Sequence, residues 1–125
     1  MKPLAPFHQP GEHQTEPAAV CFADSHTHLD YPDFTRDLDA VMARAAQVGV
    51  VHINTIATRL TGVLSQLKIA ERFPGIAVSV GIHPHYAGEA EEASVAAIIA
   101  AASHAKIVAV GETLEESGYL EFRLP

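Results

Sequence analysis

The amino-acid sequence predicts an α/β fold built around a parallel sheet, and two observations support this prediction. From residue 20 onward, apolar segments of strand length alternate with segments of helical periodicity. The expected strands begin near residues 20, 50, 76 and 106, so that a strand and its returning helix take roughly 26 to 30 residues, the spacing of right-handed βαβ units. We therefore expect one domain of about four βα units over residues 20–112.

The first third of the chain contains an extension, a strand and a helix. Residues 1–19 hold four of the eight prolines and follow no regular period, so we expect a flexible N-terminal extension. The segment VCFAD, residues 20–24, predicts the first strand. Residues 35–49 predict a helix, because apolar residues recur at helical spacing, acidic residues occupy the first turn and Gly49 ends it.

The remaining elements repeat the same order. Residues 50–56 (VVHINTI) predict a second strand and residues 61–73 a second helix that ends before a Pro-Gly pair. Strands are expected at 76–83 and 106–112, with an alanine-rich helix at 91–105 between them. Because Val and Ile run almost continuously through the last three strands, we expect both faces of the sheet to be covered.

Composition favours a packed, acidic protein. The chain is 48% hydrophobic and 18% charged, and its formal net charge of -7 is unfavourable for binding a phosphate backbone through a basic face. The single cysteine, Cys21, cannot form an internal disulfide and is expected to be buried, which fits a reducing compartment. The sequence shows neither a membrane span nor a secretory signal, so we expect a cytoplasmic protein without membrane contact.

Ionisable residues follow the carboxyl ends of three expected strands. Parallel α/β folds place their active sites at this end of the sheet, so these side chains are expected to converge on one rim. The alternative for the first group is a solvated turn, but a solvated turn does not predict further ionisable residues at the same end of neighbouring strands. The residues are Asp24, His26 and His28 after the first strand, His83 and His85 after the third, and Glu112 after the fourth.

The pair His26 and His28 predicts a metal site. In extended backbone, side chains at i and i+2 leave the same face with Cα atoms roughly 6.5 to 7 Å apart, so both imidazoles can reach one cation. An accidental polar pair in a loop is the alternative. Asp24 has two interpretations, a partner that holds an imidazole tautomer or a polar strand terminator.

Glu112 is the second candidate ligand. A carboxylate at the end of an apolar strand is costly unless it is paired or bound to metal, so a ligand role and a core salt bridge are the two interpretations. His83 and His85, in the segment GIHPH, could bind metal, and contact with a substrate phosphate is as plausible. His52, inside the second strand, is expected to be a core histidine with satisfied hydrogen bonds.

Mixed histidine and carboxylate ligands suit zinc, manganese, iron or magnesium acting as a Lewis acid, which makes hydrolysis the implied reaction. Two ions bridged by Glu112 would attract phosphate oxygens where a basic patch is lacking. An acidic composition and phosphodiester chemistry are therefore compatible.

Three segments in order, DSHTHLD, SVGIHPH and VAVGE, resemble the TatD family of metal-dependent deoxyribonucleases, which belongs to the amidohydrolase-like set of (β/α)8 barrels. The likeness covers residues 22–112 almost without a gap. It implies a TIM-barrel type fold and a divalent-metal hydrolase acting on DNA phosphodiester bonds, with two zinc, manganese or magnesium ions in the complete family enzyme. His26 and His28 match the metal ligands of the first strand, Glu112 matches the catalytic carboxylate that bridges or shares the metals, and His83 and His85 match the substrate-side motif.

The resemblance also has departures. A complete barrel needs about 250 residues, whereas four βα units fit here, so residues 20–112 look like the N-terminal half of such an enzyme. Residues 113–125 form an atypical tail that differs from the Gly-Leu-Asp-Tyr type segment usual in the family. Because the ligands of the fifth, sixth and eighth strands are absent, we expect a truncated, weakly active or inactive form.

Two other functions remain open at this point. A PHP-type phosphoesterase also begins with His-x-His after its first strand, although GIHPH followed by VGE disfavours it. A non-catalytic fragment that serves as a binding or assembly module is the other, and metal content per chain would discriminate. A half barrel would leave the first and fourth strands as edges, so we also expect self-association.

Overall fold

The computed structural model describes residues 20–90 and 92–112. The expected extension at 1–19 and the tail at 113–125 lie outside the described residues. The elements in chain order are β1 (Phe22–Thr27), α1 (Pro32–Thr35), α2 (Leu38–Gln47), β2 (Val50–Ile56), the 3-10 helix η1 (Leu60–Gly62), α3 (Val63–Arg72), β3 (Ile76–Val80), the 3-10 helix η2 (Pro84–Glu89), α4 (Glu92–Ala102) and β4 (Ile107–Val110).

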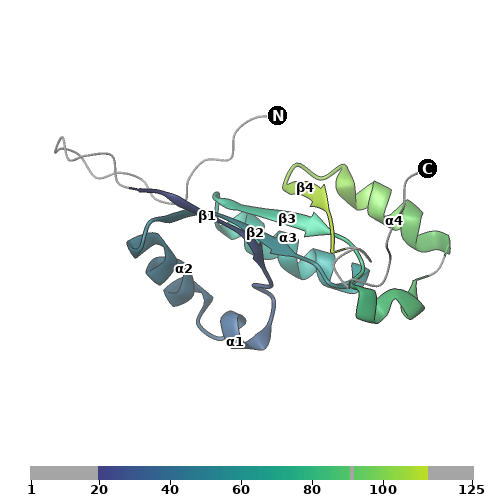
Figure 1. Ribbon diagram of the computed structural model, residues 1–125, viewed down its shortest axis with the longest axis horizontal. Coiled ribbons are helices and arrows are strands. Elements are labelled where there is room, and N and C mark those ends of the chain that lie inside the picture. The colour runs from purple at the N-terminus through teal and green to yellow at the C-terminus, as the bar shows by residue number, and fades with distance from the viewer. Residues whose placement is uncertain (1–19, 91, 113–125) are drawn as a thin grey trace, which may run out of the picture.

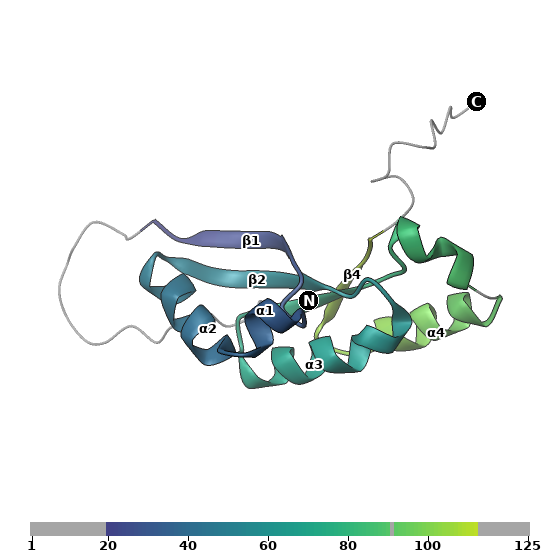
Figure 2. The ribbon, with the colours of Figure 1, turned by 90° about the horizontal axis from the view of Figure 1, so that it is seen from below.

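The four strands form one parallel sheet in the order β1-β2-β3-β4, which confirms the expected α/β topology (Figure 1). Each strand pairs with the next strand in the chain, so all four carboxyl ends lie at the same edge. Helices α2, α3 and α4 lie along one side of the sheet, as Figure 2 shows. The βα alternation read from the sequence is therefore the architecture of the described chain.

The core lies between the helices and the sheet. Ile53 of β2 and Val78 of β3 pack with Leu38 and Met42 of α2 and Ile69 of α3 in the larger cluster. Burying such side chains stabilises the fold by roughly 1.5 to 3 kcal/mol each. A smaller cluster around Ala57, Val63 and Val80 continues this core toward the carboxyl ends of the strands.

Several boundaries differ from the expected ones, since β3 ends at Val80 and β4 at Val110, and two differences affect the start of the chain. The helix expected at 35–49 is broken, because Asp37 leaves helical geometry with φ -139° and ψ 39°, which separates α1 from α2. Strand β1 continues to Thr27, three residues beyond the expected end, so that His26 lies inside the strand. Irregular pairing with β2 between Asp24 and Thr27 accompanies this extension.

The expectation that both faces of the sheet are covered is correct for β3 and wrong for β4. All five residues of β3 are buried, whereas Val108 and Val110 of β4 are exposed. Cys21, expected in the core, is exposed because it precedes β1 at the edge of the described sheet. Among the described residues, no helix has both the length and the apolar character needed to span a bilayer.

Candidate metal centre

The carboxyl ends of β1, β3 and β4 bring four ionisable side chains together. His26 and His28 come from the end of β1, His83 follows β3, and Glu112 lies two residues beyond β4. Glu112 is the central residue of the group, with its side chain only 5% exposed. The sequence prediction that these residues converge on one rim is confirmed for these four.

Each oxygen of the Glu112 carboxylate faces imidazole nitrogen. Oε1 lies 2.7 Å from Nε2 of His26 and 3.4 Å from Nε2 of His28, and Oε2 lies 3.3 Å from Nε2 of His83. The His83 distance is within ion-pair range, but Oε2 is buried and forms no hydrogen bond among the described residues. An orphaned carboxylate oxygen is costly in a protein interior, which marks this side chain as a candidate for a cation.

The hydrogen bonds of His28 fix which ring nitrogen can bind a cation. Its Nδ1 lies 2.8 Å from the carbonyl oxygen of Ile56, and since a carbonyl only accepts, Nδ1 carries the proton. A neutral ring then has its lone pair on Nε2, the atom that faces Glu112 at 3.4 Å. Oε1 already forms a hydrogen bond of 2.7 Å with His26 Nε2, and the facing lone pair of His28 is favourable only with a cation, a proton or a metal ion, between the two groups.

His83 has the opposite tautomer. Its Nδ1 accepts a hydrogen bond of 3.1 Å from the backbone N–H of His85, so a neutral ring carries its proton on Nε2. The Nε2–H group then lies 3.3 Å from Glu112 Oε2 without forming a hydrogen bond to it, which makes this nitrogen a donor rather than a ligand. His85 itself is exposed, and its ring centroid lies 4.6 Å from that of His83.

Asp24 contacts the backbone of the site. Its Oδ1 accepts a hydrogen bond of 3.0 Å from the backbone N–H of His26. Among the described residues, Asp24 accepts this hydrogen bond from an amide and none from an imidazole, so the interpretation that Asp24 holds a tautomer is not supported. The contact instead shapes the irregular part of β1 from which His26 projects.

A buried polar network, which the sequence analysis missed, supports His28. The Gln66 amide on α3 is fully buried, and its Nε2 donates to the Ile56 carbonyl, the same oxygen that accepts from His28. Nε2 also donates to Asp30 Oδ1 at 2.7 Å, while Oε1 accepts from the Thr55 hydroxyl. Helical spacing with Val63, Ile69 and Ala70 places Gln66 on the buried face, and a polar residue at such a position was the available signal.

Asp30 belongs to the same network, two residues beyond His28. Burial raises the pKa of the Asp30 carboxyl above its usual value, against the opposing effects of a backbone hydrogen bond and of the nearby His28. The hydrogen bond from Gln66 to Asp30 holds the loop after β1 against α3. The hydrogen bond from Gln66 to the Ile56 carbonyl connects the same network to the end of β2. Tyr31 closes this loop by stacking on His28, with ring centroids 5.1 Å apart.

His52 differs from its expected role. It lies half-buried in β2, but its Nδ1 is buried without a hydrogen-bond partner among the described residues. The expectation of a satisfied core histidine is therefore wrong for this atom. His52 is not part of the group formed by His26, His28 and Glu112.

The donor set fits a divalent cation. One ligand atom from each of His26, His28 and Glu112 lies within 4.8 Å of the other two, which bonds of about 2 Å from a shared ion can span. Two imidazole nitrogens and one carboxylate oxygen suit zinc, manganese and iron. The buried carboxylate without a partner at Oε2 and the lone pair at His28 Nε2 agree with this fit.

Comparison with known proteins places the fold in a class. The protein "YJJV, TATD homolog" from Escherichia coli K12, known from a crystal structure, matches 73% of this chain at a TM-score of 0.67 and 35% identity. The metal-dependent hydrolase YjjV of the same organism is 36% identical over 96 residues. The chain is therefore an α/β protein whose fold is similar to that of a TatD homolog and whose sequence is similar to that of a metal-dependent hydrolase.

Residues 23–113 match the family model described as "TatD related DNase". The chain belongs to the TatD family. The 3'-5' ssDNA/RNA exonuclease TatD of Salmonella typhimurium is 36% identical over 89 residues, which cover 71% of this chain. This assignment favours the TatD interpretation over the PHP-type one.

The chain spans about a third of the length of these relatives. The matched region is 37% of YjjV and 34% of the Salmonella exonuclease. In the YjjV crystal structure it is 36% of the chain. The activity of a whole relative is therefore a proposal for this chain.

Proposed function

We propose that the chain forms part of a divalent-metal-dependent phosphodiesterase that acts on DNA, with His26, His28 and Glu112 as metal ligands. The arrangement of His28 and Glu112 is the observation that carries this proposal. A tautomer fixed by the Ile56 carbonyl directs a nitrogen lone pair at a buried carboxylate, and a bound metal ion would satisfy both acceptors. When bound, the ion acts as a Lewis acid on a phosphodiester oxygen.

The other residues of the rim act on the substrate side. His83 directs Nε2–H toward the space beside Glu112, where it can donate to a phosphate oxygen. His85 is exposed next to it and can reach a second phosphate oxygen from the outer side. Asp24 positions His26 through the backbone and not through the ring.

We further propose that the 125-residue chain by itself is weakly active. The group of three ligands among the described residues supports one ion, whereas two-metal phosphodiester cleavage requires two ions about 3.5 to 4 Å apart. Zinc, manganese and magnesium all remain candidates for the metal. The alternative function, a non-catalytic binding or assembly module, corresponds to a cleavage activity of zero.

Metal uptake tests the ligand assignment. We expect equilibrium dialysis of the full chain against zinc or manganese to give about one ion per chain, and His26→Ala and Glu112→Ala to lower the affinity at least about tenfold. His104→Ala and Glu71→Gln are matched controls, because these side chains lie 4.0 Å apart and outside the ligand group. Equal uptake by all five proteins would show that any metal sits elsewhere.

A further inference from the structure

Most described basic side chains whose contacts are known lie away from the rim. Two arginines on helices pair with carboxylates away from the rim. One lysine binds backbone carbonyls at the amino end of β3, opposite the rim. The pairs are Arg44 with Asp37, Arg72 with Asp39, and Lys106 with the carbonyls of Pro74 and Ile76. Arg59 is different, because it follows β2 at the carboxyl ends of the strands.

Arg59 is stacked on an aromatic ring of the next rim segment. Its guanidinium carbon lies 3.6 Å from the centroid of the Tyr86 ring in η2. Stacking holds a guanidinium in a fixed plane, and the edge of a guanidinium in a fixed plane matches the geometry of phosphate oxygens. Tyr86 therefore orients a cation at the rim.

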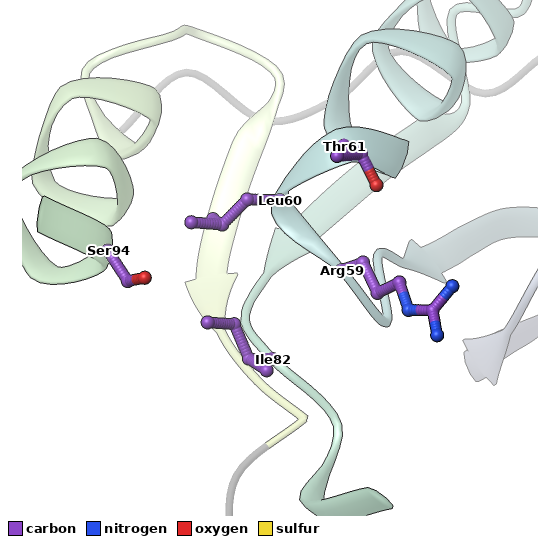
Figure 3. A pocket seen from close by; sticks show the side chains of 5 residues that line it. All are labelled: Arg59, Leu60, Thr61, Ile82 and Ser94. Carbon is purple, nitrogen blue, oxygen red and sulfur yellow. The ribbon is translucent and has the colours of Figure 1, made fainter. Parts of the chain in front are cut away.

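The guanidinium of Arg59 points away from the pocket that this residue borders (Figure 3). A pocket of about 110 Å³ lies between η1 and α4, lined by Leu60, Thr61, Ile82 and Ser94 together with Arg59. Figure 3 shows Leu60 and Ser94 pointing toward each other across this pocket, while the guanidinium of Arg59 points away from both. The charged end of Arg59 thus does not fill the pocket.

A continuous row of side chains links Arg59 to the candidate metal centre. The Tyr86 ring lies next to that of His83, with centroids 6.1 Å apart, and His83 Nε2 lies 3.3 Å from Glu112 Oε2. Arg59, Tyr86, His83 and Glu112 therefore follow one another along the rim. A strand of nucleic acid with one phosphate at the metal ligands would run its neighbouring phosphates along this row.

We propose that Arg59, held in place by Tyr86, binds a phosphate of the nucleic-acid strand next to the phosphodiester at His26, His28 and Glu112. This inference rests on the proposed function and adds a subsite to it. Charge makes the subsite consequential, because a chain of net charge -7 repels a polyanion unless fixed cations offset the repulsion. Arginine suits the task since its fork binds phosphate through two parallel hydrogen bonds.

Binding of a fluorescein-labelled phosphorothioate oligothymidylate, which resists cleavage, tests the inference by fluorescence anisotropy with zinc present. We expect Arg59→Ala to weaken binding about tenfold, the loss typical of a charge-assisted hydrogen bond. The slope of log K against log salt should fall by about 0.7, the value for one single-strand phosphate. A purely structural role of Arg59 would change thermal stability but not this slope.

Conservative variants and a matched control sharpen the result. Arg59→Lys should restore part of the affinity, and Tyr86→Phe should bind like wild type whereas Tyr86→Leu binds more weakly, because only the ring orients the guanidinium. Lys68→Ala removes the same charge from the exposed side of α3 and should leave affinity and slope unchanged. Equal effects of Arg59→Ala and Lys68→Ala would overturn the inference.

The remaining outcomes separate this inference from the proposed function. Binding that inorganic phosphate competes away at equal concentration would indicate a site for free phosphate and would overturn the strand assignment. A wild-type chain that binds metal but no oligonucleotide would overturn the subsite and the DNA substrate, while leaving the metal ligands intact. If neither His26→Ala nor Glu112→Ala lowers metal uptake, the metal centre itself is refuted, independently of the result for Arg59.

Discussion

At the residue scale, hydrogen bonds decide what each histidine of the rim can do. His28 and His83 look alike in the sequence, since each lies next to the end of a strand in a His-x-His segment. Their tautomers differ because the Nδ1 of His28 meets a carbonyl and that of His83 meets an amide N–H. Sequence spacing could place both rings at the rim, but it could not distinguish a ligand from a donor.

Gln66 is the residue through which α3 acts on the metal centre. It donates to the Ile56 carbonyl, which in turn fixes the His28 tautomer. We expect Gln66→Leu, similar in volume but without the amide, to weaken zinc affinity by about 10- to 100-fold, the usual effect of losing an outer partner of a metal ligand. Competition with a zinc-chelating dye measures this affinity.

A matched control separates positioning from general destabilisation. Ile69→Ala lies on the same buried face of α3 and should cost about 2 to 5 kcal/mol of stability, but it leaves the polar network intact. Zinc affinity at a temperature where both variants are folded should fall for Gln66→Leu and hold for Ile69→Ala. Equal losses would mean that Gln66 acts on folding alone.

At the element scale, periodicity predicted the order of strands and helices, and local geometry set their limits. Four strands at regular intervals were sufficient to expect parallel pairing, and all four occur in that order. The break at Asp37 and the continuation of β1 to Thr27 depend on backbone angles and on pairing with β2, which a hydrophobic pattern does not encode. For the same reason the strand predicted from the hydrophobic pattern ended at Asp24, whereas β1 continues through His26.

The end of β3 touches the end of β4 so closely that Gly81 has no room for a side chain. A Cβ added at Gly81 would lie 2.6 Å from the carbonyl carbon and oxygen of Gly111 and 2.7 Å from the carbonyl oxygen of Glu112. Because these are backbone atoms, Gly81→Ala must displace the segment that carries the Glu112 carboxylate. We expect a loss of about 1 to 3 kcal/mol in stability and a clear drop in zinc affinity.

Gly88→Ala is the control for this variant, since a Cβ at Gly88 meets nothing within 4 Å. Urea denaturation and zinc titration should show no change in Gly88→Ala and losses in both measurements for Gly81→Ala. If Gly81→Ala kept wild-type zinc affinity, the close approach of the two strand ends would not determine where Glu112 lies.

At the scale of the whole molecule, the described helices lie along one side of the sheet and leave edge strands exposed. β1 and β4 are the edges of the described sheet, and apolar side chains on both are exposed, among them Phe22 at 54% and Val108 at 41%. Unpaired edge strands with apolar side chains favour pairing with another chain. The sequence prediction of self-association agrees with this exposure but is not tested by it.

We expect the purified 125-residue chain to self-associate in sedimentation equilibrium, with an apparent mass that rises with concentration. Val108→Lys should reduce association, because a lysine on an edge strand opposes pairing of sheets. Leu64→Lys provides the control, since Leu64 is equally apolar and 70% exposed but lies on α3. A monomer at every concentration, or equal effects of both lysines, would rule out association through the strands.

The last prediction concerns catalysis by the chain as a whole. Efficient two-metal cleavage holds both ions a few ångströms apart in a dry cavity, whereas the described group of three candidate ligands could hold one ion and His26 is 45% exposed to solvent. Water at an exposed ligand weakens the electrostatic stabilisation on which phosphodiester cleavage depends.

We therefore expect the 125-residue chain with added manganese to cleave DNA no faster than its His26→Ala variant, measured by release of acid-soluble nucleotides. Manganese-dependent cleavage that disappears in His26→Ala would contradict this expectation and would mean that four strands are sufficient for the chemistry. Weak cleavage that increases in proportion to the associated fraction would instead connect activity to self-association.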